Sequence, residues 1–471
     1  MPVRIGILGN YGHHNNGDEA ILWGLLRQLA AWPEPPRVTV FSFDPADTRR
    51  RHPQVEAVPV LVRKGGKVAL LPTVLALYRR LRQLDLLIIG GGALLMDTFR
   101  HQALLYTGVA RIARLAGVPV VYHAVGAGPI ETALGRRLIR NSANRAASVS
   151  VRDSESQELL KRIGVRRPVA VVSDPAFGLT AADGGVMWNE AEPSGASGTG
   201  ADGEGTELTE EQEKRIGEGA SAGARRWLPP RRPGVLRVGI SAMPCYYPGL
   251  ASDGDPERYR AYVEGMRTLT RELSAVEVPT AVEIVYFGTK YPQDVETAKD
   301  ILAGMDVETL TAPWSAEPDS GGTRAGTATG AGRQGQPGQK KQKKVYLLDR
   351  ELAPPDLIAL MGELDMLIAT RLHALILAAV AGTPSIGIAY RSKVQAIFAD
   401  NGREKWAVSP EEAGWPAKLL DLWRTMAGRL EEERQAVRRM AEANRQAAYE
   451  QTRALARWVR SGVHIQEGGT T

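Results

Sequence analysis

An apolar segment that ends in three consecutive glycines limits the fold of this chain more than any other feature. Leu84–Ile89 is almost wholly apolar, and Gly90, Gly91 and Gly92 follow it directly. An apolar run without alternation predicts a strand covered on both faces, as in a parallel sheet with helices on each side. Glycines at the end of such a strand leave the backbone open, either for close packing of a helix or for a ligand.

Strand-like and helix-like segments alternate along the chain, and the pattern begins again in the second half. We expect strands at Arg4–Leu8, Arg37–Phe43, Leu84–Ile89, Val118–Ala124, Ala147–Val151 and Ala170–Val172, then at Leu236–Ser241, Glu283–Phe287, Val345–Leu347, Leu364–Ala369 and Ser385–Ile388. Such alternation predicts parallel sheets of right-handed crossover units. The sequence therefore predicts an α/β protein with two Rossmann-like domains, residues 1–180 and 234–416, facing a cleft. Long C-terminal helices are expected in residues 417–471, with Leu419–Arg460 as continuous helix.

Two segments lack the apolar residues that an ordered core requires. Residues 181–233 and 313–344 are rich in Gly, Ser and charged residues, and they hold much of the chain's total of 50 glycines. Because such composition cannot offset ordering entropy, we expect flexible linkers or insertions. The second ends in the basic run Lys340–Lys344, which fits a solvated loop or a contact with a membrane or nucleic acid.

The overall composition excludes several classes of protein. Hydrophobic residues make up 43% of the 471 residues and charged residues 24%, which is typical of a globular chain. Cys245 is the single cysteine, so a disulfide framework or a cysteine metal cluster is excluded. The net charge of +6 favours anionic partners. We find no run long enough to span a membrane. We expect a soluble cytoplasmic protein, with contact at the inner face of the membrane as an option. Basic charge outside Lys340–Lys344 is sparse and unclustered, so we expect no nucleic-acid partner.

The turn after the first strand is dense in polar residues. Residues Gly9–Ala20 contain Asn15, Asn16, Asp18 and Glu19 at the expected start of a helix that runs from Asp18 to Ala31. In a doubly wound sheet this turn lies at the carboxyl edge of the strands, where ligands bind. The turn matches neither GxGxxG nor a P-loop, and its two histidines have no partner at ligand spacing, so we expect no metal or cofactor. A plain turn, with acidic residues favouring the helix N-terminus, remains the alternative.

Positively charged residues follow later strands at the same edge. Arg152 stands where a strand runs into a helix that Asp153 or Ser154 can cap. In the second half, Thr370 is expected to cap a helix whose first turn holds Arg371 and His373, with Lys393 one crossover away. A helix N-terminus with an arginine binds anions, and a histidine there can move a proton near neutral pH. The alternatives are a surface position for Arg152, an ion pair for Arg371, and core packing for His373.

Taken in order, seven segments resemble the polysaccharide pyruvyl transferase family, and the bacterial cell-wall members in particular. They are Gly9–Ile21, Ile88–Asp97, Gly126–Pro129, Ser150–Ser156, Ser173–Phe177, Thr370–Leu375 and Tyr390–Val394. The resemblance implies a two-domain glycosyltransferase-B-like fold. It implies transfer of pyruvyl from phosphoenolpyruvate to two hydroxyls of a sugar, N-acetylmannosamine of a lipid-linked precursor, as a cyclic ketal.

The resemblance also implies which residues carry the reaction. The family's phosphoenolpyruvate-binding positions match Arg152, Arg371, His373 and Lys393. From the residue chemistry we expect catalysis by His373, Arg371 and Asp18. The sugar acceptor is assigned to Asn15, Asn16, Asp18, Glu19, Gly91, Gly92 and Asp97. Asp18, Glu19, Asp97 and Asp174 are the candidates for orienting the sugar hydroxyls or for the general base.

One departure from the family pattern leaves other functions open. The family often has an arginine soon after the first strand of the second domain, whereas Gly239–Tyr247 contains none. Either the family arginine corresponds to another position of this sequence, or a different residue supplies its positive charge. A nucleotide-sugar-dependent glycosyltransferase of the same architecture and a non-catalytic glycan- or anion-binding protein are the alternatives.

Overall fold

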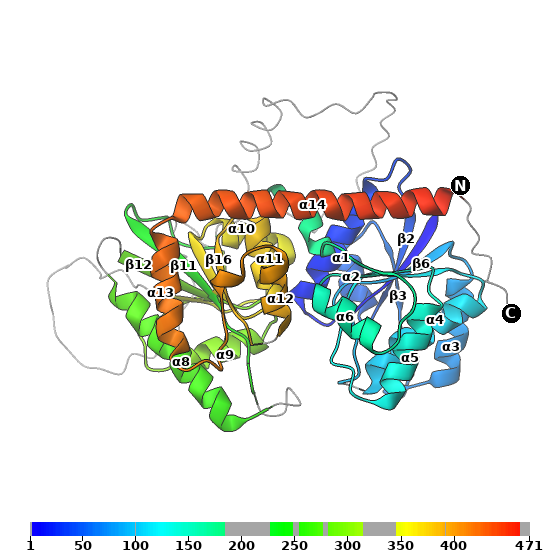
Figure 1. Ribbon diagram of the computed structural model, residues 1–471, viewed down its shortest axis with the longest axis horizontal. Helices are drawn as coiled ribbons and strands as arrows, with labels where there is room; N and C mark the ends of the chain where they lie inside the picture. Colours follow the sequence, from blue (N-terminus) through cyan, green and yellow to red (C-terminus); the bar gives the residue numbers. More distant parts are fainter. Residues whose placement is uncertain are drawn as a thin grey trace, which may run out of the picture.

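The chain folds into two α/β domains that lie side by side, each built on its own parallel sheet (Figure 1). The computed structural model describes residues 2–98, 100–183, 227–247, 254–276, 281–313, 345–390 and 392–461. The two Rossmann-like sheets and the C-terminal helices confirm the fold expected from the alternating pattern.

The N-terminal sheet has the order β10-β9-β8-β6-β1-β2-β3, with the short strand β7 paired to β8. Its strands are β1 (Arg4–Leu8), β2 (Arg37–Ser42), β3 (Glu56–Pro59), β6 (Leu86–Gly90), β7 (Ala93–Leu95), β8 (Val120–Ala127), β9 (Ser148–Val151) and β10 (Val169–Val171). A separate antiparallel hairpin joins β4 (Arg63–Lys64) to β5 (Lys67–Val68). The direction of winding reverses between β1 and β6, so their carboxyl ends form the place where such sheets bind ligands.

The C-terminal sheet has the order β13-β14-β12-β11-β15-β16-β17. Its strands are β11 (Val235–Ser241), β12 (Ala281–Phe287), β13 (Glu308–Leu310), β14 (Val345–Leu348), β15 (Met366–Ala369), β16 (Ser385–Ile388) and β17 (Ala407–Val408). Here the winding reverses between β11 and β15, which repeats the design of the first domain.

Helices cover both faces of each sheet, which explains why the central strands β6 and β15 are buried along their whole length. The N-terminal domain contains α1 (Asn16–Ala30), α2 (Pro45–Arg51), α3 (Leu70–Leu81), α4 (Arg100–Leu115), α5 (Ala133–Asn144), α6 (Ser154–Arg162), η1 (Pro175–Gly178) and η2 (Ala181–Asp183). The C-terminal domain contains α8 (Pro256–Ala275), α9 (Gln293–Leu302), α10 (Pro354–Gly362), α11 (Leu372–Val380), α12 (Ser392–Asp400), η3 (Glu404–Trp406) and α13 (Trp415–Ala427).

The two domains share packing rather than facing each other across open space. Ala20 and Ile21 of α1, together with Phe177 of η1, belong to the buried cluster that forms the core of the C-terminal domain. The last helix, α14 (Leu430–Arg460), runs along both domains (Figure 1). Its Asn444 accepts a hydrogen bond from Ser173 Oγ at 3.1 Å and donates one to Asn401 Oδ1 at 2.8 Å. These contacts hold the two domains together.

Some residues at the ends of the expected linker 181–233 have defined contacts, so the linker is shorter than its composition predicts. Trp227 and Leu228, inside the expected linker 181–233, are buried in the core of the C-terminal domain. At the other end, the Asp183 carboxylate accepts hydrogen bonds from the amide and the hydroxyl of Thr180. Those end residues are therefore ordered, and the prediction was wrong for them because two large apolar side chains suffice to anchor a segment. Residues 184–226 and 314–344, with the basic run, lie outside the described residues.

Three helix boundaries also differ from the expectation. Helix α1 begins at Asn16, two residues early, because the Asn15 side chain caps it by accepting from Gly17 N at 3.3 Å. Helix α11 begins at Leu372 with Arg371 as its N-cap, while the Thr370 hydroxyl bonds to that of Tyr262 at 3.1 Å. The expected continuous helix Leu419–Arg460 is broken at Gly428, where three glutamates then favour the N-terminus of α14.

Candidate functional site

The candidate site lies where the N-termini of α1 and α11, one from each domain, meet. A Cβ added to Gly17 would lie 2.3 Å from His373 Nδ1, so the imidazole packs directly on the first turn of α1. Asn16 N donates to Thr289 O at 3.2 Å, which ties α1 to the loop after β12. Within the described residues no side chain caps α11. Two positive helix ends therefore converge on one place, which favours an anion.

Arg152, Asp174 and His373 form a buried cluster across the domain junction. Arg152 Nη1 lies 3.0 Å from Asp174 Oδ2 and 3.2 Å from His373 Nε2, and that Nε2 lies 3.6 Å from Asp174 Oδ2. A neutral imidazole can accept from Arg152 through Nε2, and a protonated one faces the Asp174 carboxylate. Each protonation state of the histidine thus has a partner, which suits a group that moves a proton.

Asp174 stays ionised in this cluster. Burial alone raises the pKa of its carboxyl, but the hydrogen bond from His373 and the charge of Arg152 outweigh burial and hold that pKa well below its ordinary value. Asp174 also accepts from Ala176 N at 3.0 Å as the N-cap of η1. It therefore orients Arg152 and His373 as a fixed negative charge. The sequence reasoning named Asp174 as a candidate for orienting a sugar hydroxyl or for the general base.

Arg371 is held by a carboxylate that the sequence did not single out. Its Nε and Nη2 lie 2.6–2.8 Å from the Asp294 oxygens, and Asp294 is fully buried at the start of α9. Burial lowers the pKa of Arg371, but the Asp294 charge and hydrogen bonds raise it overall. The ion pair weighed as an alternative is therefore present. It leaves the guanidinium one fifth exposed, with its remaining edge available to a ligand.

Lys290 is a functional candidate that the sequence reasoning missed. It follows β12 at the carboxyl edge of the C-terminal sheet, and its backbone bridges to Asn15 of the other domain. Burial and the neighbouring Arg371 lower the pKa of Lys290, while Asp294 and Asp18 oppose that shift. Strand β12 pairs with β11, after which the family arginine is missing. The sequence feature that could have pointed to Lys290 is its place shortly after the expected strand Glu283–Phe287.

Lys393 lies at the edge of the same region. Its Nζ donates to Gly128 O at 3.0 Å across the domain junction. The turn that holds Gly128 also approaches Arg152, because a Cβ on Gly126 would lie 3.5 Å from Arg152 Nε. Ser392 and Glu155, whose side chains hydrogen-bond at 2.7 Å, flank this contact. Lys393 and Arg152 therefore border one glycine-rich turn.

Part of the predicted acceptor set is assembled beside His373. Asp18 Oδ2 accepts from Asn15 Nδ2 at 2.6 Å and from Asn10 Nδ2 at 2.7 Å. A Cβ on Gly92 would lie 2.6 Å from Asp18 Oδ1, and Gly92 has a φ of +69°. The glycine is therefore required for the β6 turn to approach Asp18.

The other predicted acceptor residues are held by internal contacts. Asn16 Nδ2 donates to Leu352 O at 2.6 Å, and a Cβ on Gly91 would lie 2.0 Å from Ile21. Asp97 accepts from Glu131 N and from the Thr132 amide and hydroxyl at 2.6–2.8 Å. Asp97 and Gly91 therefore make contacts within the N-terminal domain, whereas the Asn16 side chain joins the two domains.

Glu19 is also buried, and the pKa of its carboxyl group is raised. Its Oε1 accepts from Gly12 N at 2.9 Å, and its Oε2 has no hydrogen-bond partner in the described part of the chain. Burial raises the pKa of Glu19 to about 7, although the Gly12 amide and Arg51 oppose the shift. A carboxyl group at this pKa can exchange a proton near neutrality.

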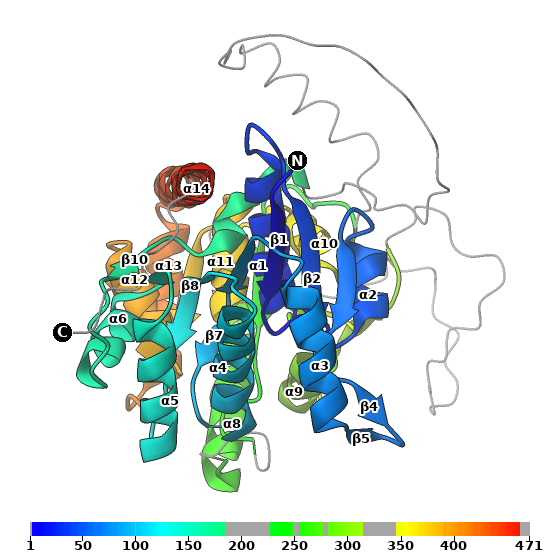
Figure 2. The ribbon, with the colours of Figure 1, turned by 90° about the vertical axis from the view of Figure 1, so that its right-hand side faces the viewer.

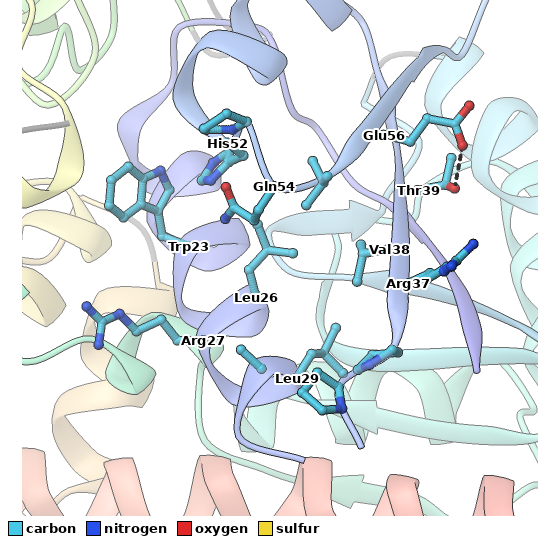
Figure 3. A pocket seen from close by; sticks show the side chains of 15 residues that line it. Trp23, Leu26, Arg27, Leu29, Arg37, Val38, Thr39, His52, Gln54 and Glu56 are labelled. Atoms are coloured by element: carbon cyan, nitrogen blue, oxygen red, sulfur yellow. Dashed lines mark hydrogen bonds between the residues drawn. The ribbon is translucent and has the colours of Figure 1, made fainter. Parts of the chain in front are cut away.

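A cavity of about 830 Å³ lies at the opposite, amino-terminal edge of the N-terminal sheet. Apolar side chains of α1 line one side and the start of β2 the other, with His52 facing Trp23 (Figure 3). Burial lowers the pKa of His52 to about 3, so its imidazole is neutral. The cavity contains none of the predicted site residues, so we place the chemistry at the domain junction.

The two docked Rossmann-like domains define the glycosyltransferase-B fold. A crystal structure of Anabaena Alr3699/HepE with UDP and glucose aligns with a TM-score of 0.53 at 13% identity, covering 98% of this chain and 99% of that one. A glycosyltransferase from Rickettsia africae aligns with a TM-score of 0.54 at 10% identity over 98% and 100%. UDP-GlcNAc 2-epimerase from Methanocaldococcus jannaschii aligns at 0.53 and 11% over 97% and 100%. These identities show the fold alone.

The family follows from the sequence match. The model of the family described as polysaccharide pyruvyl transferase matches residues 15–199 and 314–392, more than half of the chain. The chain therefore belongs to the polysaccharide pyruvyl transferase family. The match includes Arg152, Asp174, Arg371 and His373 and ends one residue before Lys393. A comparison with curated protein sequences finds no match.

Proposed function

We propose that the protein transfers the pyruvyl group of phosphoenolpyruvate to two hydroxyls of a glycan sugar, forming a cyclic ketal and releasing phosphate. Family membership supports the reaction class. The observation that carries the proposal is the cluster of Arg152, Asp174 and His373 beside Arg371, at two converging helix N-termini. This cluster offers several cationic groups to one small, highly charged anion.

The donor is bound by charge in this proposal. Phosphoenolpyruvate has a carboxylate and a phosphate, and Arg152 and Arg371 approach the junction from opposite domains. Lys290 supplies the charge of the arginine that is missing after β11, because it lies at the end of the neighbouring strand and next to Arg371. Lys393 borders the same region through the Gly128 turn.

The reaction balances with proton transfers only. Protonation of C3 makes C2 electrophilic, one sugar hydroxyl adds to C2, the C2–O bond to phosphate breaks, and the second hydroxyl closes the ketal. One hydroxyl proton ends on the new methyl group and the other on the released phosphate. His373 moves the proton or stabilises the departing phosphate, since its Nε2 has a partner in either protonation state. Asp18, with Asn15 and Gly92, orients the acceptor.

The finer substrate assignment rests on the resemblance to cell-wall members of the family. We propose N-acetylmannosamine on a lipid-linked precursor as the acceptor, at the cytoplasmic face of the membrane. The nucleotide-sugar alternative has no observation in its favour here, because the neighbours that bind UDP share only the fold.

The experiment measures phosphate release from phosphoenolpyruvate with and without a synthetic lipid-linked N-acetylmannosamine acceptor. We expect acceptor-dependent release and a product heavier by a pyruvyl ketal. A thermal shift with phosphoenolpyruvate but no release would keep the donor and reject this acceptor. Neither release nor shift, together with a thermal shift by a nucleotide-sugar, would overturn the proposal in favour of glycosyl transfer.

A further inference from the structure

The described residues include one large exposed apolar surface, on the N-terminal domain. It comprises the hairpin β4–β5 and α3, where Leu70 and Leu71 are 74% and 69% exposed. The other exposed apolar side chains of this segment are Val68, Val74, Leu75 and Tyr78. Scattered exposed leucines need no explanation, but a contiguous group on one helix marks an interaction surface.

The neighbouring helices extend this surface at the same end of the domain. Helices α4 and α5 follow β7 and β8 and therefore begin at the carboxyl edge of the parallel sheet, and α3 follows the β4–β5 hairpin that the chain forms after it leaves the carboxyl end of β3. They pack side by side, and Figure 2 shows them along the side of the domain away from α14. Leu104 near the start of α4 is 51% exposed, and Leu134 at the start of α5 is 57% exposed. The exposed leucines thus line the end of the domain that holds the Gly92 turn.

The charge on these elements has one sign. Residues 57–84 contain six Lys and Arg and no Asp or Glu, and α4 and α5 also contain arginines and no acidic residue. Arg63 and Lys67 of the hairpin and Arg79 and Arg82 at the far end of α3 are exposed.

We infer that this surface, the β4–β5 hairpin with the first turns of α3, α4 and α5, docks on an anionic lipid bilayer. Exposed leucines enter the interface between headgroups and acyl chains, and the lysines and arginines attract the anionic headgroups. A second copy of the chain is disfavoured, because a two-fold contact would place two such cationic surfaces against each other. Nucleic acid would satisfy the charges but would leave the leucines in water.

The contact is peripheral. No helix within the described ranges is both long enough and apolar enough to cross a bilayer. The docking surface and the Gly92 turn lie at the same end of the domain, so a bilayer held there would lie beside the candidate site. The inference does not depend on pyruvyl transfer, because it rests on exposed apolar area and charge alone.

The test is co-sedimentation of the full chain with vesicles of phosphatidylglycerol and phosphatidylcholine, compared with phosphatidylcholine alone. We expect binding to the anionic vesicles, weakened by salt, and little binding to the neutral ones. Leu70→Ser with Leu71→Ser, and separately Arg63→Glu with Lys67→Glu, should each lower the bound fraction about tenfold or more. The matched controls lie at the opposite end of the domain: Leu115→Ser, 69% exposed, and Arg162→Glu with Arg166→Glu.

Three outcomes would overturn the inference. The first is no vesicle binding by the unmodified chain. The second is equal binding by all variants, which would move the contact to another surface. The third is a dimer in sedimentation velocity that Leu70→Ser with Leu71→Ser abolishes, which would make the surface a self-association site. The leucine variant should keep full activity on a water-soluble acceptor, so loss of docking is distinguished from loss of the proposed reaction.

Discussion

Arg152 of the N-terminal domain and His373 of the C-terminal domain are joined across the domain junction, with 3.2 Å between Nη1 and Nε2. Arg152 is paired with Asp174 of its own domain, and His373 reaches both residues only across the junction. The site therefore exists only when the two domains are docked, and the packing of α1 and α14 on both domains keeps them so.

Replacing His373 tests proton transfer. His373→Ala should lower kcat for acceptor-dependent phosphate release by about 100-fold or more, the usual contribution of a positioned acid or base. Steady-state release assays measure this, with His101→Ala, an exposed position on α4, as the control for loss of an imidazole. Full ketal formation by His373→Ala would show that the assigned role is wrong.

Replacing Asp174 tests the electrostatic balance of the site. Asp174→Asn leaves the Arg152 charge buried without its carboxylate, which should cost about 3 kcal/mol of stability. A bound anion can replace the missing charge, so phosphoenolpyruvate should raise the Tm of this variant more than that of the unmodified chain. Thermal denaturation with and without the donor measures both effects. Equal shifts in the two proteins would separate Asp174 from the anion site.

Replacing Lys290 tests whether it carries the missing positive charge. Lys290→Met should raise KM for phosphoenolpyruvate about tenfold, because one hydrogen bond to a charged group is lost. Lys290→Arg keeps the charge and should restore most of the affinity. Lys299→Met, on the exposed face of α9, is the control. An unchanged KM in Lys290→Met would return the search to other cations at the junction.

His52 predicts a pH dependence of stability in the N-terminal domain. Its folded pKa of about 3 lies below the ordinary 6.5, so the unfolded chain binds the proton first as pH falls. Stability from this group is complete above about pH 6.5 and is lost progressively below it, by about 2 kcal/mol at pH 5. His52→Phe keeps an aromatic ring beside Trp23 and should lose that dependence. Urea unfolding at pH 7 and pH 5 measures the difference, with exposed His101→Phe as the control.

The sequence alone determined the class of fold and one side of the site. Apolar strands that end in glycines at Gly90–Gly92 and Gly126–Gly128 predict parallel strands whose turns share an edge, because side-chain periodicity and glycine backbone freedom are local properties. The position of Arg371 and His373 at a helix start is local for the same reason. Helix boundaries shifted by one or two residues where a single cap, such as Asn15, decided the first turn.

Only the tertiary structure decided which side chains meet. Asp294 and Lys290 join Arg371, and Asp174 joins His373, through strand order and domain docking, which spacing along the chain does not encode. The fold also assigns Asp97 to hydrogen bonds inside the N-terminal domain, and it assigns Asn16 to a hydrogen bond with Leu352 O across the domain junction. A buried polar group must find a partner wherever the fold supplies one. Its role therefore depends on contacts between residues that are hundreds of positions apart, such as Arg152 and His373.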